Sequence, residues 1–571
     1  MTLHVAAVGV DRQLSLPLKA VIATSEAATT LTPFLRAHFS EERHVQRLRP
    51  DLDGNWWLID TDAAMVSRNS AGWLSGGRFL PTPAPTRPVT VATSPERIAV
   101  LNSDPASLII YGRDNLAQRT ITGLQRPTDV VALSDGTWAV ADMRLGGVLI
   151  FDQQGVRIRT HVRSGTGGWD LLTRLASDGK LLYALDSTTP VIAVFGVEAQ
   201  PLAMWPQDRA SRPIAIAAQG GRVYVLSTSG AIRVLDPKGQ LTLSMPSAVG
   251  ALPDEALGAP SDVTVNSLGE VFVTYPEREM IARHSADGKQ LHIRHARAWT
   301  WRAYAADGAN HLYALDPDHH RVVVLDQDGW RLTTLGKATK QGGTFESSLA
   351  LAVHPDGAAL AVLDEKNRQI TRFDLTNNTS LVFGGDGKTD GLFDAPVSLT
   401  MDQDGRTYVL DGGLHRVSVF DAQGHFQCHI GRYERGDAPD LLRAPRLVAV
   451  SPDGAKVFIY DEDVSLIKSF SLDHTNNHVR HLGNFGGRGT APGQFLRLTG
   501  MNCDRRGRLY CLDYKREDLQ VFNVAANAPT LITGLRGETY GIRKLLSLAL
   551  NPEGIAFIIG GDQLTGLRWQ P

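Results

Sequence analysis

Short apolar stretches that end in aspartate recur along the whole chain. Clear examples are LYCLD at 509–513, TYVLD at 407–411 and LYALD at 182–186. Each follows a turn such as DQDG or LSDG, and each precedes a second apolar stretch that ends in a large residue. Because apolar residues alternate with polar ones over short runs bounded by turn residues, the pattern predicts β-strands joined by tight turns.

A nearly constant interval links the two stretches of each copy. In eleven of twelve copies, the residue ending the first stretch lies nine positions before the residue ending the second, and one copy has eight. The pairs are Asp60 and Asn69, Asn102 and Tyr111, Asp142 and Phe151, Asp186 and Phe195, Ser227 and Leu235, Tyr275 and His284, Asp316 and Leu325, Asp364 and Phe373, Asp411 and Phe420, Asp461 and Phe470, Asp513 and Phe522, and Gly560 and Trp569. Such regularity indicates a structural repeat of roughly 44 residues.

One copy illustrates the predicted unit of four strands. Residues 396–402, 407–411, 416–421 and 426–431 would form strands A, B, C and D, separated by glycine-containing turns. Four short antiparallel strands per repeat of this length are typical of a β-propeller blade. The sequence therefore predicts an all-β fold of tandem β-propellers, in which neighbouring blades cover each other's apolar faces.

Twelve copies exceed the usual four to eight blades of one ring. Two six-bladed rings fit best, with residues 47–290 in the first, residues 291–571 in the second and a seam near 288–300. A single ring of twelve blades and a division into seven and five are the alternatives.

The last copy ends at its strand C, and an unpaired edge strand favours aggregation. We expect the N-terminal extension, residues 1–46, to supply the missing strand from 3–10 or 14–24. Residues 32–46 would then form a short helix before the first blade.

Two glycine-rich loops carry a more specific pattern. Residues 385–393 (GDGKTDGLF) and 487–495 (GRGTAPGQF) share G-x-G-x-x-x-G-x-F, and each precedes another copy of the repeat. On these motifs the chain resembles the NHL-repeat family of six-bladed propellers, most closely in copies seven to eleven. The resemblance implies a protein-binding platform; some members bind RNA, and related propellers act as lyases or lactonases.

Three recurrent motifs have a structural explanation. The glycine loops enter a strand rather than open a helix, so we expect Phe393 and Phe495 to plug between blades rather than the loops to bind phosphate. The D-x-D-G turns lack the further ligands of an EF-hand and predict hairpin turns instead. The aspartates that end strand B recur too often for catalysis and should brace the turn between strands B and C.

Candidate binding residues come from the loops expected on one face of the rings, those between strands B and C and between strands D and A. They are His319, His320, Arg416, Arg488, Tyr514, Lys515, Arg516 and Arg536, with Arg543 and Lys544 nearby. Arginines interleaved with an aromatic residue suit RNA stacking, but Glu517, Asp518 and Glu538 lie among them and weaken that interpretation. His319 and His320 with Asp316 and Asp318 suggest a metal site only weakly, because adjacent side chains rarely reach one ion.

Charge, cysteine content and the lack of long apolar runs disfavour several classes of protein. The net charge of -2 lacks the gross basicity of most nucleic-acid-binding proteins. Three cysteines, Cys428, Cys503 and Cys511, form neither a disulfide framework nor a zinc set. The chain shows no signal peptide and no membrane-spanning run, so we expect a cytoplasmic protein or part of a particle assembled there. Arginine greatly outnumbers lysine, which favours a bacterial or phage source.

The sequence thus predicts a non-enzymatic scaffold that binds another protein through its loops, with no catalytic residue, metal or cofactor assigned. One alternative is a propeller-type lactonase or lyase with a divalent metal in a central opening. Another is a structural component of a phage-tail-like particle.

Overall fold

The computed structural model describes residues 31–38, 45–51, 53–69, 76–79, 81–162, 172–196, 201–248, 257–295, 303–326, 329–336, 338–339, 342–343, 345, 347–436, 438–526, 528–540, 543–560 and 563–569. Nearly all regular structure in these ranges is β-strand. The helical elements there are short 3-10 turns: η2 (Arg209–Ser211), η3 (Pro276–Arg278), η4 (Pro317–His319) and η5 (Gly537–Tyr540).

The first six sets of four antiparallel strands, called the N-terminal sheets below, follow chain order. The first five are separate four-stranded sheets, and the sixth is joined edge to edge with the next four strands of the chain in one eight-stranded sheet. Their strands are β2 (Arg47–Pro50), β3 (Trp56–Asp60), β4 (Met65–Asn69) and β5 (Gly76–Arg78); β6 (Pro88–Thr93), β7 (Arg97–Ser103), β8 (Ala106–Gly112) and β9 (Ala117–Ile121); β10 (Pro127–Ala132), β11 (Trp138–Asp142), β12 (Gly147–Phe151) and β13 (Arg157–Val162); β14 (Leu172–Ser177), β15 (Leu182–Asp186), β16 (Val191–Phe195) and β17 (Pro201–Pro206); β18 (Pro213–Gln219), β19 (Arg222–Ser227), β20 (Ile232–Leu235) and β21 (Leu241–Met245); and β22 (Asp262–Val265), β23 (Val271–Tyr275), β24 (Met280–His284) and β25 (Leu291–His295).

The other six sheets are called the C-terminal sheets. Their strands are β26 (Tyr304–Ala306), β27 (Leu312–Asp316), β28 (Arg321–Leu325) and β29 (Arg331–Leu335); β32 (Ser348–Val353), β33 (Ala359–Asp364), β34 (Gln369–Asp374) and β35 (Thr379–Gly384); β36 (Pro396–Met401), β37 (Thr407–Asp411), β38 (Arg416–Phe420) and β39 (Phe426–Gly431); β40 (Pro445–Val450), β41 (Lys456–Asp461), β42 (Leu466–Asp473) and β43 (His478–Gly486); β44 (Leu498–Cys503), β45 (Arg508–Asp513), β46 (Asp518–Asn523) and β47 (Thr530–Arg536); and β48 (Leu545–Leu550), β49 (Ala556–Gly560), β50 (Gln563–Trp569) and β1 (Leu31–His38). A two-stranded ribbon, β30 (Ala338–Thr339) with β31 (Gly342–Gly343), lies in the loop before β32.

The predicted fold class is confirmed: the protein is an all-β propeller protein built from four-stranded antiparallel sheets. Except for Phe470, which lies inside β42 (Leu466–Asp473), the landmark residues fall at or next to the ends of strands B and C, as β37 ends at Asp411 and β38 at Phe420. Strand B is buried on both faces in most sheets, because the sheets on either side cover it. This arrangement explains why strand B reads as a nearly continuous apolar run.

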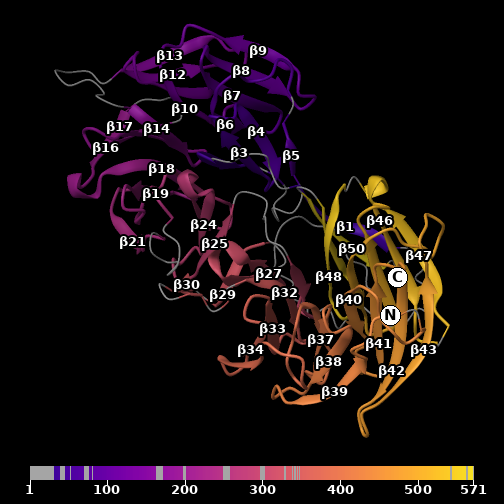
Figure 1. Ribbon diagram of the computed structural model, residues 1–571. Helices are drawn as coiled ribbons and strands as arrows, with labels where there is room; N and C mark the ends of the chain where they lie inside the picture. The colour runs from indigo at the N-terminus through magenta and orange to yellow at the C-terminus, as the bar shows by residue number, and fades with distance from the viewer. Residues whose placement is uncertain are drawn as a thin grey trace, which may run out of the picture.

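Contacts between the innermost strands follow two cycles. Strand β2 contacts β6 and also β22, and β26 contacts β32 and also β48. Apolar clusters fill both closing contacts: Trp56 packs with Phe272, and Tyr304 lies in one cluster with Phe557. Figure 1 shows two corresponding groups of strands. Strand β25 pairs with β24, so the sixth sheet continues past the expected boundary at 290.

The last sheet is closed by an N-terminal strand, as expected, but by a different segment. Strand β1 (Leu31–His38) pairs antiparallel with β50, and Figure 1 shows it in indigo among yellow strands. The predicted helix over 32–46 is therefore wrong over 32–38, because pairing with the open edge of β50 overrides the local helical pattern. The segments 3–10 and 14–24 lie outside the described residues.

A tryptophan joins the two groups of sheets. Trp330, in the turn before β29, is 1% exposed and packs with Phe272 of the sixth sheet at a ring-centroid distance of 6.1 Å. Arg283 lies over its ring at 4.5 Å. Nearby, Ile293 of β25 pairs with Arg331 of β29, so two outer strands meet edge to edge. The contact fixes the two groups against each other through both apolar and backbone interactions.

Candidate functional site

One register position of strand A differs sharply along the N-terminal sheets. It lies opposite the penultimate residue of the strand B landmark stretch, as Asp129 lies opposite Ala141. From the first sheet to the sixth, the residues at this position are Arg47, Thr90, Asp129, Arg174, Ala215 and Asp262. Since strand A is innermost in a propeller blade, four charged side chains and one hydroxyl meet near the axis of these sheets.

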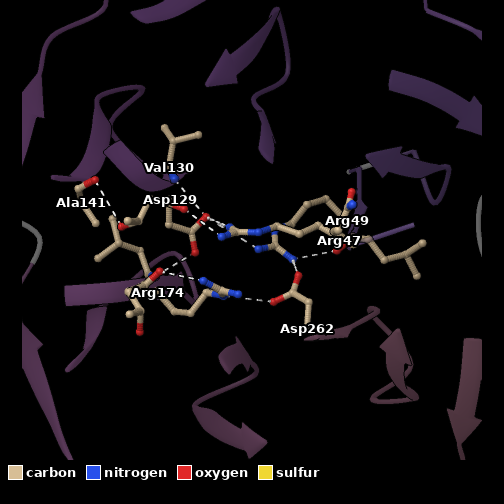
Figure 2. Close-up of polar contacts among 12 residues, drawn as sticks. Arg47, Arg49, Asp129, Val130, Ala141, Arg174 and Asp262 are labelled. Atoms are coloured by element: carbon tan, nitrogen blue, oxygen red, sulfur yellow. Dashed lines mark hydrogen bonds and ion pairs between the residues drawn. The ribbon is translucent and has the colours of Figure 1, made fainter. Parts of the chain in front are cut away.

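The charged side chains form ion pairs between sheets that are not neighbours in sequence. Arg47 donates from Nη1 to Asp129 Oδ1 at 2.8 Å and from Nη2 to the carbonyl oxygen of Thr128 at 2.8 Å. Arg49, two residues along β2, donates to Asp262 Oδ2 at 2.5 Å. The other carboxylate oxygen of Asp262 lies 3.5 Å from Nε of Arg174. Figure 2 shows the three guanidinium groups converging on the two carboxylates.

Burial makes this charge cluster electrostatically unusual. Both aspartate side chains are at most 1% exposed, and the three arginine side chains are 6% to 18% exposed. Burial opposes the charge of Asp129, yet Arg47, Arg49 and Arg174 hold its pKa below the usual value. Burial and the nearby Arg174 lower the pKa of Arg47 to about 10. Against the burial cost, Asp262 and Asp129 raise the pKa of Arg49.

The cluster does not have the donor set of a metal centre. The carboxylate of Asp129 also accepts the backbone N–H groups of Val130 and Leu175, each at 3.0 Å. With three guanidinium groups around two carboxylates, the charge environment disfavours a further cation. Among the described residues, no group of three or more His, Cys, Asp or Glu side chains is arranged to hold a metal ion. The cluster braces the inner strands across the axis.

In the last five C-terminal sheets, no charged residue occupies the same register position. The residues there are Ala350, Ser398, Leu447, Gly500 and Ser547 in the last five sheets. Near the other end of strand A, a cavity of about 90 Å³ lies between all six C-terminal sheets. Its lining includes three prolines, Pro355, Pro452 and Pro552, with Asn502 and Cys503. None of its lining residues carries a carboxylate or an imidazole.

The aspartates that end strand B brace turns, as predicted. Asp513 accepts backbone N–H groups from Lys515 and Arg516 at 2.9 and 3.0 Å in the turn between strands B and C. It also accepts the N–H groups of Leu496 and Arg497, at 2.7 and 3.1 Å, from the preceding loop. Asp411 makes the equivalent bonds. One carboxylate therefore fixes two loops on the same face.

The glycine loops are structural, as predicted. Phe393 and Phe495 are fully buried and pack on Phe420 and Phe522 of the following sheet at 5.8 and 5.9 Å. Gly486 has φ +104°, and a Cβ there would lie 2.5 Å from the Phe495 ring. The D-x-D-G turn at 402–405 is a hairpin turn in which Asp402 accepts the N–H groups of Asp404 and Arg406.

Two of the candidate binding residues hold these loops in place. Arg416 is 8% exposed and donates to the carbonyl oxygens of Lys388 and Thr389 at 2.9 and 3.2 Å. Arg516 donates to the carbonyl oxygens of Gly489 and Ala491 at 3.2 and 3.1 Å and pairs with Asp518 at 2.7 Å. Both guanidinium groups are therefore engaged inside the loop face.

The remaining loop candidates are more accessible. Arg488 and Lys515 are exposed and make no ion pair within the part of the chain that the structure describes, and Lys515 lies 6.0 Å from the ring of Tyr514. Arg536 is exposed and lies 3.5 Å from Glu538. Arg488, Tyr514 and Lys515, called the loop patch below, are the candidates that remain available to a partner.

His319 and His320 lie between β27 and β28, in the predicted loop. His319 Nδ1 lies 2.9 Å from Asp316 Oδ2, and its side chain is half exposed. His320 ends the 3-10 turn η4 with φ +53°. The His319 ring therefore pairs with the Asp316 carboxylate across the turn. Cys428, Cys503 and Cys511 are all free thiols.

No protein-family model matches the chain, and no curated protein matches it in sequence. Among solved structures, the β-propeller domain of Cps50 (Swd1) from Myceliophteria thermophila is similar, with 9% identity and a TM-score of 0.35, over 62% of this chain and 94% of that one. No helix in the described ranges is long and apolar enough to cross a membrane.

Sequence reasoning missed the axial charge cluster. Its five members come from four sheets, and the paired residues Arg49 and Asp262 lie 213 positions apart in the sequence. A local signal existed in two sheets: Pro127-Thr128-Asp129 and Pro260-Ser261-Asp262 place an aspartate where Pro396-Val397-Ser398 has a serine. A buried charge at an otherwise small or apolar position of strand A was the available clue.

Proposed function

We propose that the protein is a non-enzymatic scaffold of two six-bladed rings, with residues 47–295 in the first and 303–569 closed by β1 in the second, that binds a protein partner through the loop patch. The observation that carries this proposal is the contrast among the candidate side chains on one face. Arg416 and Arg516 are engaged in holding loops, whereas Arg488 and Lys515 are exposed and unpaired among the described residues. Rigidly held loops that display free side chains suit recognition.

Preorganisation supports the proposal. Asp513 ties the 487–497 loop to the turn that carries Tyr514 and Lys515, and Phe495 anchors the same loop between sheets. A partner would therefore pay little entropy for ordering these loops. We propose that this role needs no cofactor. We also propose that the protein is located in the cytoplasm or in a particle assembled there.

The loop geometry also supports kinship with NHL-type propellers. Parallel bridges join Asp386 to Phe393 and Arg488 to Phe495, and a third joins Arg435 to Leu442. Three successive loops between strands D and A thus share one construction, although the 435–442 loop lacks the full glycine pattern. The shared construction explains the sequence motif as a folding requirement rather than a ligand site.

The test is cross-linking capture of the intact chain from its native host, with partners identified by mass. Arg488→Glu/Lys515→Glu should reduce recovery of a specific protein at least about tenfold, since charge reversal creates repulsion across an interface. Arg209→Glu/Lys238→Glu, a charge-matched change at exposed residues of the N-terminal sheets, is the control.

Equal recovery with both double variants would contradict the loop patch as the binding surface. A second arm measures binding of single-stranded oligouridine to the purified chain. RNA binding that depends on Arg488 and Lys515, with no protein captured, would replace the protein partner by RNA.

A further inference from the structure

Strand β9 (Ala117–Ile121) is the outermost strand of the second sheet and has β8 on one side only. At its start, the chain itself adds a short extended segment to the free edge. Thr82 donates its N–H to the carbonyl oxygen of Asn115 at 2.9 Å, and Ala117 donates to the carbonyl oxygen of Thr82 at 2.9 Å. This is a parallel bridge between Thr82 and Leu116. Beyond Ala117, no described strand pairs with this edge.

A groove of about 780 Å³ continues along the uncovered part of β9. Its apolar lining includes Leu149 and Phe151 of β12, which are 1% and 4% exposed, and Ile121. The turn at Gly155 closes it from the third sheet, because a Cβ there would lie 2.9 Å from Arg119 Cγ. In Figure 1, β9 and the β12–β13 hairpin lie at the outer rim of the N-terminal sheets.

The groove is positively charged. Arg119 and Arg157 are exposed lining residues, and neither forms an ion pair within the described ranges. Among the lining residues, none carries a carboxylate. Polar groups of Gln118, Thr120 and Thr122 fill the rest of the wall.

We propose that this groove binds an extended, acidic segment of a partner protein as an added strand on β9. An unpaired strand edge offers backbone donors and acceptors to such a segment. Carboxylates on alternate residues of the segment would then pair with Arg119 and Arg157. The short bridge to Thr82 shows that this edge accepts an extended segment. The surface is separate from the loop patch, so the two proposals stand or fall independently.

The test uses the full chain and a fluorescent peptide that alternates glutamate and valine, measured by anisotropy. Arg119→Glu/Arg157→Glu should weaken binding about tenfold, from two lost and reversed charge pairs. The same variant should bind the lysine–valine peptide about tenfold more tightly than the wild type does. Arg126→Glu, at an exposed arginine outside the groove lining, should change neither affinity.

Backbone pairing has its own readout. Methylation of alternate backbone nitrogens of the glutamate–valine peptide removes the N–H donors along one edge of the peptide strand. It should abolish binding when the methylated edge is the one that faces β9. Absence of glutamate–valine binding to the wild type, or affinity unaffected by Arg119→Glu/Arg157→Glu, would overturn the proposal. So would a single-stranded oligonucleotide that binds with the same arginine dependence while the acidic peptide does not. Unchanged capture through the loop patch by the groove variant separates this proposal from the proposed function.

Discussion

The N-terminal and C-terminal sheets fill one register position of strand A in different ways. In the first group, Asp129 and Asp262 with three arginines fill the axis with ion pairs. In the second, uncharged and mostly small residues occupy the position, and at Gly500 the inner strands approach so closely that an added Cβ would lie 2.7 Å from Leu548 Cβ. The comparison teaches that the repeat specifies the sheets, whereas single residues decide how each axis is closed.

The ion pairs of the N-terminal sheets and the close packing of the C-terminal sheets differ in their sensitivity to substitution. A buried ion cluster depends on every member, because removing one leaves an uncompensated charge. Close packing of small residues depends instead on volume. Substitutions at equivalent positions should therefore have different consequences in the two groups.

The largest effect is expected at Asp129. Asp129→Ala removes the carboxylate that pairs with Arg47 and accepts two backbone N–H groups. Because it leaves a buried guanidinium unpaired, we expect a loss of about 3–5 kcal/mol in the free energy of unfolding of the N-terminal sheets. Urea unfolding measures it. Ser398→Ala, at the equivalent C-terminal position, should cost about 1 kcal/mol or less. Equal losses for both variants would contradict the comparison.

A smaller effect is expected at Gly500. Gly500→Ala should lower the free energy of unfolding by about 1–3 kcal/mol, because its Cβ would force β44 and β48 apart. Gly534→Ala in the same sheet is the control, since the nearest atom to an added Cβ is 4.0 Å away. A loss at Gly534 as large as that at Gly500 would show that strand conformation, not close approach, explains the effect.

The pH response should also separate the groups. His284 of β24 is fully buried, and neither ring nitrogen has a hydrogen-bond partner within the described residues. Burial lowers the pKa of His284 to about 4. Between pH 6.5 and 4 the unfolded chain therefore binds more protons than the folded chain. The free energy of unfolding decreases as the pH is lowered through this range, by up to about 1.4 kcal/mol per pH unit.

His311 in the C-terminal sheets should respond in the opposite direction. Its hydrogen bond to Asp307 raises the pKa of His311, so this contribution is fully present below pH 6.5 and is lost as pH rises through the raised pKa. Thermal unfolding across pH measures both. His284→Leu should flatten the acid dependence of the N-terminal sheets, and an unchanged profile would exclude His284 as its source.

The smallest effect on stability is expected at the loop patch. Arg488→Glu/Lys515→Glu should change the free energy of unfolding by less than about 0.5 kcal/mol, because both side chains are exposed. Differential scanning calorimetry checks this. A larger loss would mean that these residues hold the loops as Arg416 and Arg516 do, and would remove the contrast on which the proposed function depends.

The sequence predicted the strands well because each local signal acts within one sheet. The aspartate of strand B binds two loops on one face of its own sheet, and the large residue of strand C packs against the residue that plugs the adjacent contact, so both leave a fixed spacing. Pairing of β1 with β50 joins opposite ends of the chain, and no local pattern encodes it. For the same reason Arg47 and Asp129 could not be linked from sequence alone.

Which candidate side chains are exposed could not be predicted from the sequence either. Arg416 and Arg488 both lie in or beside a loop of the same face, yet one is buried against carbonyl oxygens and the other is exposed. The difference depends on the backbone path of the glycine loop, which a pattern of residue types does not give. Residue type therefore suggested candidate binding residues. Only the packing of the loop shows which of these side chains are buried and which are exposed.

Segment-resolved hydrogen–deuterium exchange of the intact Asp129→Ala variant tests the central claim, that the N-terminal and the C-terminal sheets are closed by different axial chemistry. We predict faster exchange across the inner strands of all six N-terminal sheets, from β2 to β25, and unchanged exchange across the C-terminal sheets. Faster exchange confined to the third sheet, or spread equally through both groups, would contradict the account.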